Sequence, residues 1–186
     1  MPSITIITTS DDRSGSYIDP TLNTTDVSLG AGNFSSLDRP GGSWIPFIIN
    51  LPRRTIINSA TLQLVCTGWN GDPNINIGIY ERLNTMPVSG ADLESCTFLQ
   101  YYNRTLKMYA GTSYTWDFTT AVQGLVNYAS WVAGSTIAAL LKDNNSPVDN
   151  SASFASFENP TYAKPQLIID YTIPGVQFQI VGVFGL

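Results

Sequence analysis

Residues 60–66 read ATLQLVC, with an apolar side chain at every second position. Successive side chains of a β-strand point to opposite faces, so this spacing places one apolar set together. The set consists of Ala60, Leu62, Leu64 and Cys66, while Thr61 and Gln63 fall on the other face. The stretch therefore predicts a β-strand with one face against a core.

Similar short stretches recur along the chain. They are SITIITT (3–9), SWIPFIINL (43–51), NINIGIY (74–80), TIAALLK (136–142) and PQLIIDYT (165–172). Turn-forming sequences separate them, namely RPGG (39–42), NGDP (70–73) and NNSP (144–147). Pro46 predicts that its strand lies at an edge, because proline cannot donate to a β-ladder. Many short strands with polar turns indicate an all-β fold, an antiparallel jelly-roll β-sandwich.

One stretch, WDFTTAVQGLVNYASWV (116–132), has helical rather than strand periodicity. Its apolar residues at helical spacing are Val122, Leu125, Val126 and Ala129. Thr120, with Gln123 three residues later, predicts a capping box at the start of the helix. We expect one short helix that covers an open end of the sandwich.

Composition narrows the classes of function. The 186 residues suit one domain, only 12% of them are charged, and the formal net charge is −5. Nucleic-acid binding needs Lys and Arg concentrated on one face, so this balance argues against a nucleic-acid partner. No stretch approaches the ~20 apolar residues of a membrane span, and the first residues lack the features of a signal peptide. We expect a protein made in the cytoplasm that resides in a virion or on an extracellular surface, with no membrane partner.

Several motifs follow one another in a recognisable order over residues 12–172. They are Tyr17-Ile18; Leu51-Pro52; Ile57 with Ala60, Leu62 and Leu64; Asp117 with Thr119, Val122 and Gln123; Ala138 to Lys142; and Glu158 with Pro165, Leu167, Ile169 and Tyr171. In this order they resemble the DNRLRE-type jelly-roll domains, which open with a Tyr-Ile strand. Members of that family look like carbohydrate-binding modules, and they occur on bacterial surface proteins and in phage virions.

The chain departs from the family pattern in two places. Ile45 and Pro46 stand where the family strand carries an Arg before its Phe, and the chain continues beyond the family's final Tyr. The resemblance therefore implies a jelly-roll domain over residues 1–172 and an added C-terminal strand in residues 173–186.

The sequence offers little for catalysis. It contains no histidine, which excludes Ser-His-Asp triads, Cys-His pairs and histidine-ligated metals. Paired carboxylates remain as a general acid and base. The candidates are Asp11-Asp12, Asp92 with Glu94, and Glu158. Because no motif sets two of them across a cleft, we predict a protein that is not an enzyme, with no catalytic residues and no cofactor.

Two oxygen-rich stretches, DDRSGSYID (11–19) and DNNSPVDN (143–150), have residue types that Ca²⁺ accepts. Neither matches an EF-hand loop, and turn-forming Asn and Asp explain both without an ion. We therefore predict no metal site and keep Ca²⁺ as the alternative. Cys66 and Cys96 lack metal-binding spacing, and they form either one disulfide or two buried thiols.

Aromatic residues beside polar ones are the candidates for a sugar site, since exposed rings stack on sugars. They are Trp69 next to Asn70, Tyr80, and Tyr101-Tyr102 next to Asn103. Aromatic rings are also common in β-sandwich cores and interfaces. Trp44 and Trp116, in apolar strand contexts, are expected in the core.

The chain ends with IPGVQFQIVGVFGL (173–186), which contains no charged residue. Its second half is apolar on both faces of an alternating strand, so that half needs to be covered on both faces. The cover is either its own sheet or a neighbouring subunit that accepts it by strand addition. The residues predicted to make intersubunit contacts are Val176, Phe178, Ile180, Val181, Val183 and Phe184.

These observations support two hypotheses of function. The first is a non-enzymatic structural protein, a phage virion component such as a capsid decoration protein or a head or tail fibre subunit. It would assemble as a homo-oligomer or on other virion proteins, such as the major capsid protein. The alternative is a carbohydrate-binding module or lectin-like adhesion domain that binds surface glycans.

Overall fold

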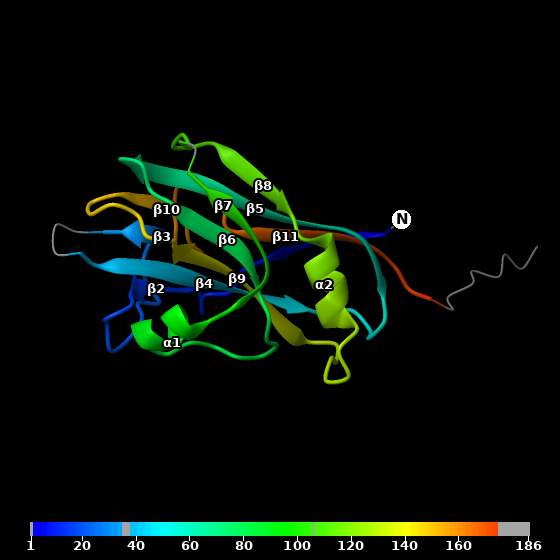
Figure 1. The fold of residues 1–186 in the computed structure, drawn as a ribbon. Helices are drawn as coiled ribbons and strands as arrows, with labels where there is room; N and C mark the ends of the chain where they lie inside the picture. Colours follow the sequence, from blue (N-terminus) through cyan, green and yellow to red (C-terminus); the bar gives the residue numbers. More distant parts are fainter. Residues whose placement is uncertain (1, 35–37, 106, 175–186) are drawn as a thin grey trace, which may run out of the picture.

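The structure is a computed structural model that describes residues 2–34, 38–105 and 107–174. Its elements are β1 (Ser3–Ile7), β2 (Arg13–Ser16), β3 (Ser28–Asn33), β4 (Pro40–Ile49), β5 (Ile56–Asn70), β6 (Ile75–Tyr80), α1 (Gly90–Ser95), β7 (Phe98–Arg104), β8 (Ser113–Asp117), α2 (Thr119–Val126), β9 (Ser135–Asp143), β10 (Ser151–Ala155) and β11 (Gln166–Thr172). All described strand pairs are antiparallel. The all-β, sandwich-like fold expected from the alternation is confirmed (Figure 1).

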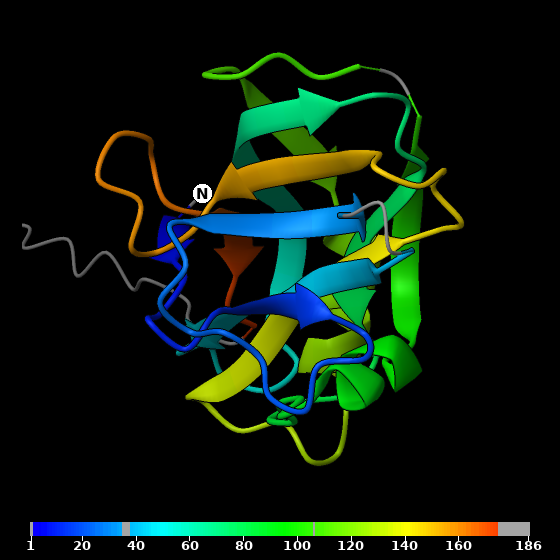
Figure 2. The ribbon, with the colours of Figure 1, turned by 90° about the vertical axis from the view of Figure 1, so that its left-hand side faces the viewer.

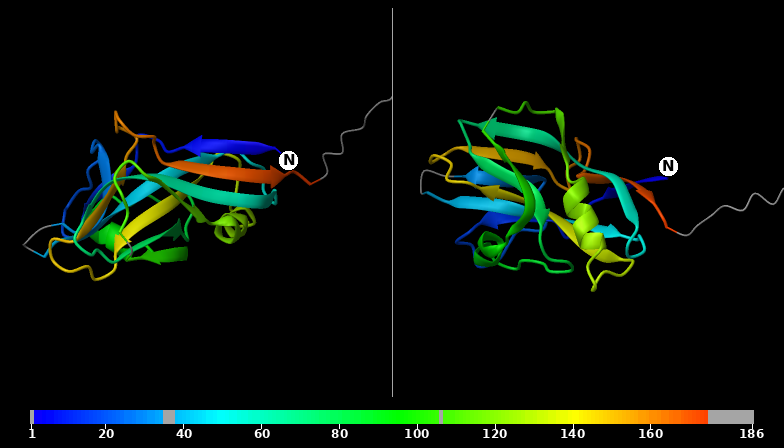
Figure 3. Two further views of the ribbon diagram at one scale, coloured as in Figure 1. Left: turned by 90° about the horizontal axis from the view of Figure 1, so that it is seen from above. Right: turned by 45° about the vertical axis from the view of Figure 1, so that its right-hand side comes forward.

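Strand β5 joins the two halves of the fold. Its first part pairs with β11 on one side and β8 on the other, and its last part pairs with β10. The register between β5 and β10 shifts between Ser153 and Phe154, and such irregularities bend a strand and increase its twist. The strands follow the order β1-β11-β5-β10-β3-β4-β9-β6-β7 and curl into a half-barrel (Figure 3). Strand β2 pairs with β4 off this path.

The apolar face of β5 forms part of the main core. All four residues of the predicted apolar set, Ala60, Leu62, Leu64 and Cys66, are fully buried. The alternating isoleucines of β6 are buried in the same cluster. Burial of each such aliphatic side chain contributes ~1.5–3 kcal/mol, so the period-two pattern alone supplies a large share of the driving force.

Helix α2 confirms the expected helix over one end of the sandwich, with its apolar side chains in the main core (Figure 1). It ends at Val126, so Ala129 lies beyond it and is exposed. The predicted capping box is wrong, because the N-cap is Phe118 and no side chain caps the helix. Gln123 instead accepts a hydrogen bond from Ile57 N at 2.7 Å and donates one to Thr55 O at 3.0 Å. The glutamine therefore ties the helix to the start of β5.

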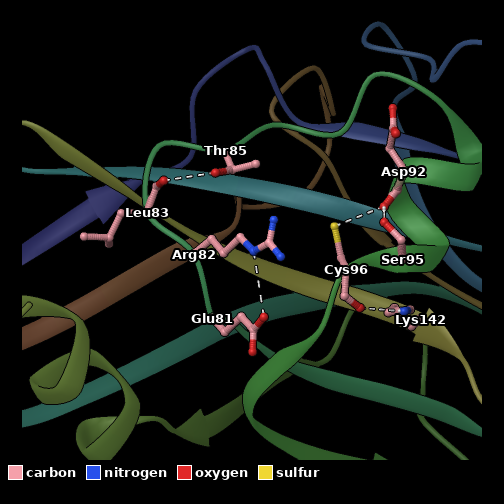
Figure 4. A network of polar contacts seen from close by, with 8 residues as sticks. All are labelled: Glu81, Arg82, Leu83, Thr85, Asp92, Ser95, Cys96 and Lys142. Carbon is pink, nitrogen blue, oxygen red and sulfur yellow. Dashed lines mark hydrogen bonds and ion pairs between the residues drawn. The ribbon is translucent and has the colours of Figure 1, made fainter. Parts of the chain in front are cut away.

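A second helix, α1, is absent from the sequence-based prediction. It is capped by a capping box between Ser89 and Asp92, and Leu93 is its buried apolar anchor. Lys142 of β9 donates hydrogen bonds to Glu94 O and Cys96 O, at 2.5 and 2.7 Å, and Figure 4 shows the second of these. A cation at the end of a helix binds its last carbonyls, so β9 holds α1 on the outer face of the sheet.

A smaller apolar cluster lies beneath α1. Its buried members are Tyr17, Leu22, Trp44, Tyr80, Leu93, Cys96, Ala138 and Leu140. Cys96 belongs to this cluster and Cys66 to the main core. Both cysteines are free thiols, which settles the choice that the sequence leaves open. Trp44 and Trp116 are both buried, as expected.

Three local predictions near β4 differ from the structure. The predicted turn at residues 39–42 is not a turn, because β4 begins at Pro40. The backbones of neighbouring strands approach Gly41 and Gly42 too closely for a Cβ atom. The Tyr17-Ile18 pair expected in a strand lies in a turn after β2. Strand β4 lies between β3 and β9 in the strand order, so the prediction that the strand of Pro46 is an edge strand is wrong. Beyond Trp44, however, the described pairs of β4 involve β9 alone, so Pro46 lies where β4 is paired on one side.

The predicted C-terminal strand lies outside the described residues, which end at Pro174. The same holds for the six predicted intersubunit residues, Val176, Phe178, Ile180, Val181, Val183 and Phe184.

Candidate functional site

The aromatic residues proposed for sugar binding do not form one site. Tyr80 is only 4% exposed and belongs to the cluster beneath α1, so its selection as a sugar-binding residue is wrong. Ile79 points into the main core, so the side chain of Tyr80, the next residue in β6, points to the opposite face of the sheet, which α1 covers. Trp69 is partly buried against the main core. Tyr101 and Tyr102 are exposed but, as adjacent residues of β7, they point to opposite faces.

Tyr102 contributes to a narrow hollow between β7 and β8, which we call the β7–β8 slot. Its volume is ≈ 200 Å³, and it is lined by Tyr102, Asn103, Arg104, Tyr114, Thr115 and Trp116. The polar groups of its tyrosines are occupied within the protein. Tyr102 donates a hydrogen bond to Asp117 O at 2.8 Å, and Tyr114 accepts one from Tyr109 N at 2.9 Å. The tyrosines of this slot therefore tie β7 and the backbone at Tyr109 to β8.

A wider hollow lies on the outer face of β2, β3 and β10, and we call it the β2–β3 groove. Figure 2 shows this face, with the light-blue strand β3 beside the orange strand β10 and the dark-blue strand β2 on the other side of β3. The groove has a volume of ≈ 390 Å³ and is lined by Ser14, Gly15, Ser16, Asp19, Asp26, Ser28, Gly30, Phe34, Arg39 and Ser153. Small-molecule sites commonly occupy ~300–1,000 Å³, so the groove is large enough for one or two sugar rings.

The floor of the groove consists of residues with small side chains. Gly30 and Ser153 are opposite partners on β3 and β10, and Ser14 and Ser16 come from β2. The neighbouring positions Leu29 and Phe154 point into the core. The inner face of β3 and β10 therefore packs on the core, while the small residues of the outer face leave a hollow.

Phe34 forms an aromatic wall directly over this floor. A Cβ atom on Gly30 would lie 2.6 Å from the Phe34 ring, and one on Gly41 would lie 2.9 Å from it. Such distances are too short for a real contact, so the Phe34 ring lies where side chains at positions 30 and 41 would otherwise be. Phe34 N also donates a hydrogen bond to Arg39 O at 3.2 Å. The ring is 39% exposed and so keeps apolar surface available to a ligand.

Two carboxylates and one guanidinium line the polar side of the groove. Asp26 accepts hydrogen bonds from Ser14 Oγ at 2.9 Å and from Asn23 Nδ2 at 2.7 Å. Asp19 accepts one from Ser16 N at 2.8 Å. These bonds fix both carboxylates, and each carboxylate has capacity for about four. Together with the Arg39 guanidinium, they offer acceptors and donors to a ligand rich in hydroxyl groups.

The candidate acids for catalysis are mostly accounted for by structure. Asp92 caps α1, and its hydrogen bonds, first from Ser89, hold the pKa of its carboxyl below the usual value. Asp12 Oδ2 accepts a hydrogen bond from Phe157 N at 2.8 Å, which brings it near Glu158, the next residue along the chain. Asp12 is only 2% exposed, so this pair is not presented to a substrate.

The calcium candidates also have local explanations. Both carboxylate oxygens of Asp143 accept backbone hydrogen bonds, from Asn145 N at 3.1 Å and Ser146 N at 3.0 Å, which is a turn arrangement. Within residues 2–34, 38–105 and 107–174, no group of three or more His, Cys, Asp or Glu side chains is arranged to hold a metal ion. No helix in these same ranges is long and apolar enough to cross a membrane.

The sequence does not predict the groove. Its lining residues come from four separate segments, and few of them are of a type that indicates a binding site. One feature of the sequence does point to it, namely the small residues in RSGS (13–16) and SLGAGN (28–33). Strands usually carry bulkier side chains at such positions. No protein-family model matches the sequence, and no curated protein matches it. The function is therefore argued from the groove itself.

Proposed function

We propose that this protein is a non-catalytic binding module and that the β2–β3 groove binds a neutral saccharide. The observation that carries the proposal is the exposed ring of Phe34 on a floor of glycine and serine, flanked by Asp19, Asp26 and Arg39. Sugar rings present an apolar C–H face and a rim of hydroxyl groups. A ring face and fixed carboxylates match these two features.

Charge favours a neutral ligand over an anionic one. Two carboxylates and one guanidinium line the groove, which leaves one negative charge in excess. An anionic sugar would meet like charge and have a single strong donor group. A neutral sugar donates its hydroxyl protons to the carboxylates and accepts from Arg39, and hydrogen bonds to charged groups are the stronger kind.

Direct binding tests the proposal. Soluble oligomers of glucose, galactose, mannose and N-acetylglucosamine would be titrated into the full chain by calorimetry, beside an oligomer of glucuronate. We expect saturable binding of at least one neutral oligomer and weaker binding of the glucuronate series. Asp19→Asn keeps an acceptor for Ser16 N while it removes the charge, so it should lower affinity severalfold, and Glu94→Gln on α1 should not. Absence of binding to every neutral oligomer would contradict the proposal.

We also propose a second function, that of a structural subunit of a larger assembly such as a phage virion. An exposed apolar surface beside the edge segment of β4 supports it. Ile48 and Met86 are 46% and 41% exposed, and with Trp44 and Pro46 they line a hollow of ≈ 240 Å³. An exposed apolar surface beside a strand segment that is paired on one side only favours association between subunits.

The oligomeric state tests this second function. The mass in solution of the full chain would be compared with that of residues 1–174 and with the variant Ile48→Lys. The assembly hypothesis predicts a mass above the monomer for the full chain, reduced in at least one of the two altered proteins. A monomer in all three, at equal stability, would reject it.

A further inference from the structure

A hollow larger than the groove lies between strand β7 and helix α2, and we call it the β7–α2 hollow. Its volume is ≈ 440 Å³. It is lined by Leu99, Gln100, Thr120, Ala121 and Gly124. The side chain of Gln100 accepts a hydrogen bond from Ala121 N at 3.3 Å and donates one to Asp117 O at 3.0 Å. The two walls of the hollow are therefore bonded to each other.

A β-bulge directs one apolar side chain of β7 towards this hollow. Ile79 and Tyr80, adjacent in β6, lie opposite Gln100 and Phe98, so Leu99 is an extra residue in its strand. Such a residue interrupts the ladder, and its side chain leaves the regular alternation. Leu99 is 40% exposed. The bulge therefore presents an exposed leucine beside α2.

The opposite wall is open because α2 carries a glycine there. Glycine is a poor residue within a helix, since its backbone loses more conformational freedom than that of other residues. A Cβ atom on Gly124 would meet no atom closer than Leu99 Cδ2 at 3.8 Å, which is an ordinary van der Waals contact. The described part of the chain therefore does not require glycine at this position. The missing side chain leaves room for a segment from outside the described residues.

The hollow and the C-terminal segment match in their lack of charge. The β2–β3 groove, the β7–β8 slot and the hollow beside β4 each have at least one charged lining residue, such as Asp19, Arg104 and Asp11. The β7–α2 hollow has none, and residues 173–186 contain none either. Burial of an unpaired charge beneath an apolar segment costs free energy. Of these four hollows, the β7–α2 hollow therefore suits the segment best.

The described chain ends close to α2. Tyr171 and Thr172, the last residues of β11, lie opposite Ile57 and Ile56 of β5. Ile57 N also donates to Gln123 of α2 at 2.7 Å, and Figures 1 and 3 show α2 and the end of β11 at the same end of the molecule. Residues 175–186 reach up to ~40 Å when extended, and a helix with its side chains is ~10 Å across. The segment is therefore long enough to pass over α2 to the hollow.

We propose that the C-terminal segment binds in the β7–α2 hollow of its own chain, with residues 180–184 between the bulge of β7 and the open face of α2. This half of the segment is apolar on both faces, and the hollow offers one wall from a strand and one from a helix. A segment joined to β11 has a high effective concentration at the hollow, which favours its own chain over a second copy. The contact goes beyond both proposed functions and depends on neither.

A spin label near the end of the full chain tests the contact. Gly185→Cys provides the attachment point for a nitroxide, and the native thiols of Cys66 and Cys96 are buried, so the label is placed at one position. We expect the amide signals of the residues that line the hollow to lose most of their intensity. Those of Gly30 and Ser153, in the groove, should keep theirs. Unchanged signals around the hollow would overturn the proposal.

A mixed sample decides whether the contact lies within one chain. Spin-labelled chains without isotope are mixed with isotope-labelled chains without a spin label, so that only contacts between chains reduce the signals. We expect no loss of intensity at the hollow in this sample. A loss as large as in the first sample would assign the segment to a second copy and overturn the proposal.

A variant of the helix wall and a matched control locate the contact. Gly124→Lys places a long charged side chain in the hollow, and lysine is a better helix former than glycine, so the chain should fold and the loss of intensity should disappear. Thr97→Lys, at an exposed residue directly before β7, should keep it. A loss that persists in Gly124→Lys, or that disappears in both variants, would contradict the hollow as the site. Because these experiments contain no saccharide and detect contact within one chain, their failure is distinguishable from failure of either proposed function.

Discussion

The β2–β3 groove and the β7–β8 slot are both hollows in one curled sheet, but they are built from opposite kinds of residue. The slot contains the aromatic residues that stand out in the sequence, and its tyrosine hydroxyls are bonded within the protein. The groove contains small residues and one ring, and its carboxylates keep unused acceptor capacity. The comparison teaches that the tyrosines of the slot join strands, while the groove that we propose as a binding surface lies where bulky side chains are missing.

Among the substitutions, the largest effect on stability is expected from filling the floor of the groove. Gly30→Ala places a Cβ where the Phe34 ring lies, so the ring is displaced and the free energy of unfolding falls by about 1–3 kcal/mol. Gly68→Ala on neighbouring β5 is the matched control, because its Cβ would meet only Ser153 Cβ at 4.0 Å. Chemical denaturation of both variants gives the comparison. Equal stabilities would show that the ring does not depend on the missing side chain.

Removal of the ring comes next. Phe34→Ala should lower saccharide affinity about tenfold, equivalent to ~1.4 kcal/mol, because the sugar loses its apolar contact. Tyr101→Ala, which removes a 55% exposed ring on β7, should leave affinity unchanged. Calorimetry on both variants, with thermal unfolding as a check on folding, compares the ring of the groove with an exposed ring of β7 that lies outside the slot. A larger loss in Tyr101→Ala would reverse the assignment.

A further prediction concerns pH, because a buried carboxyl with a raised pKa, that of Asp12, lies directly before β2. The pKa of Asp12 is raised from 3.8 to about 7 in the folded chain, so the folded state binds more protons than the unfolded state between these values. Stability should therefore fall as pH rises from about 4 to 7 and level off above, with each unit of pKa difference worth ~1.4 kcal/mol.

The pH profile of the unfolding free energy checks this expectation. Asp117 and Asp170 have lowered pKa values, chiefly because hydroxyl groups donate to them. Their contribution is lost only below about pH 4, so it does not mask the neutral-range slope. Asp12→Asn should flatten the profile between pH 4 and 7, and a profile that rises across this range in the unaltered chain would refute the assignment.

The smallest effect is expected in the slot. Tyr102→Phe removes the hydroxyl that donates to Asp117 O, which should cost about 1 kcal/mol of unfolding free energy. Saccharide affinity should not change. Denaturation and calorimetry on the same sample test both halves of this prediction, and a loss of affinity at unchanged stability would make the slot the binding site.

Much of the fold follows from local patterns in the sequence. The alternation in residues 60–66 predicts which side chains of β5 are buried. The failures share a cause, which is contact between distant segments. Gly41 and Gly42 look like a turn but serve close strand approach, and Gln123 bonds to β5 rather than capping its helix. Leu93 is a single apolar residue and does not by itself predict α1. Because α1 covers the cluster that contains Tyr80, the sequence does not predict the burial of Tyr80 either.

The candidate site was less accessible to sequence reasoning. In the sequence, nothing distinguishes three lining residues from other residues of polar turns, namely Asp19, Asp26 and Arg39. They line one groove only in the folded chain. Phe34 is one apolar residue in a polar stretch, and its role depends on two glycines that touch it only in the folded chain. In a sequence, such a groove is indicated only by small residues that recur on two strands.

The most direct test of the central claim is a map of amide chemical-shift changes on titration with the neutral oligosaccharide that binds best. The proposed function predicts that the changes concentrate at Ser14–Asp19, Ser28–Gly30, Phe34 and Ser153, and leave Tyr101–Arg104 and Tyr114–Trp116 unmoved. Changes concentrated on β7 and β8 instead, or no saturable change with any neutral oligomer, would contradict it.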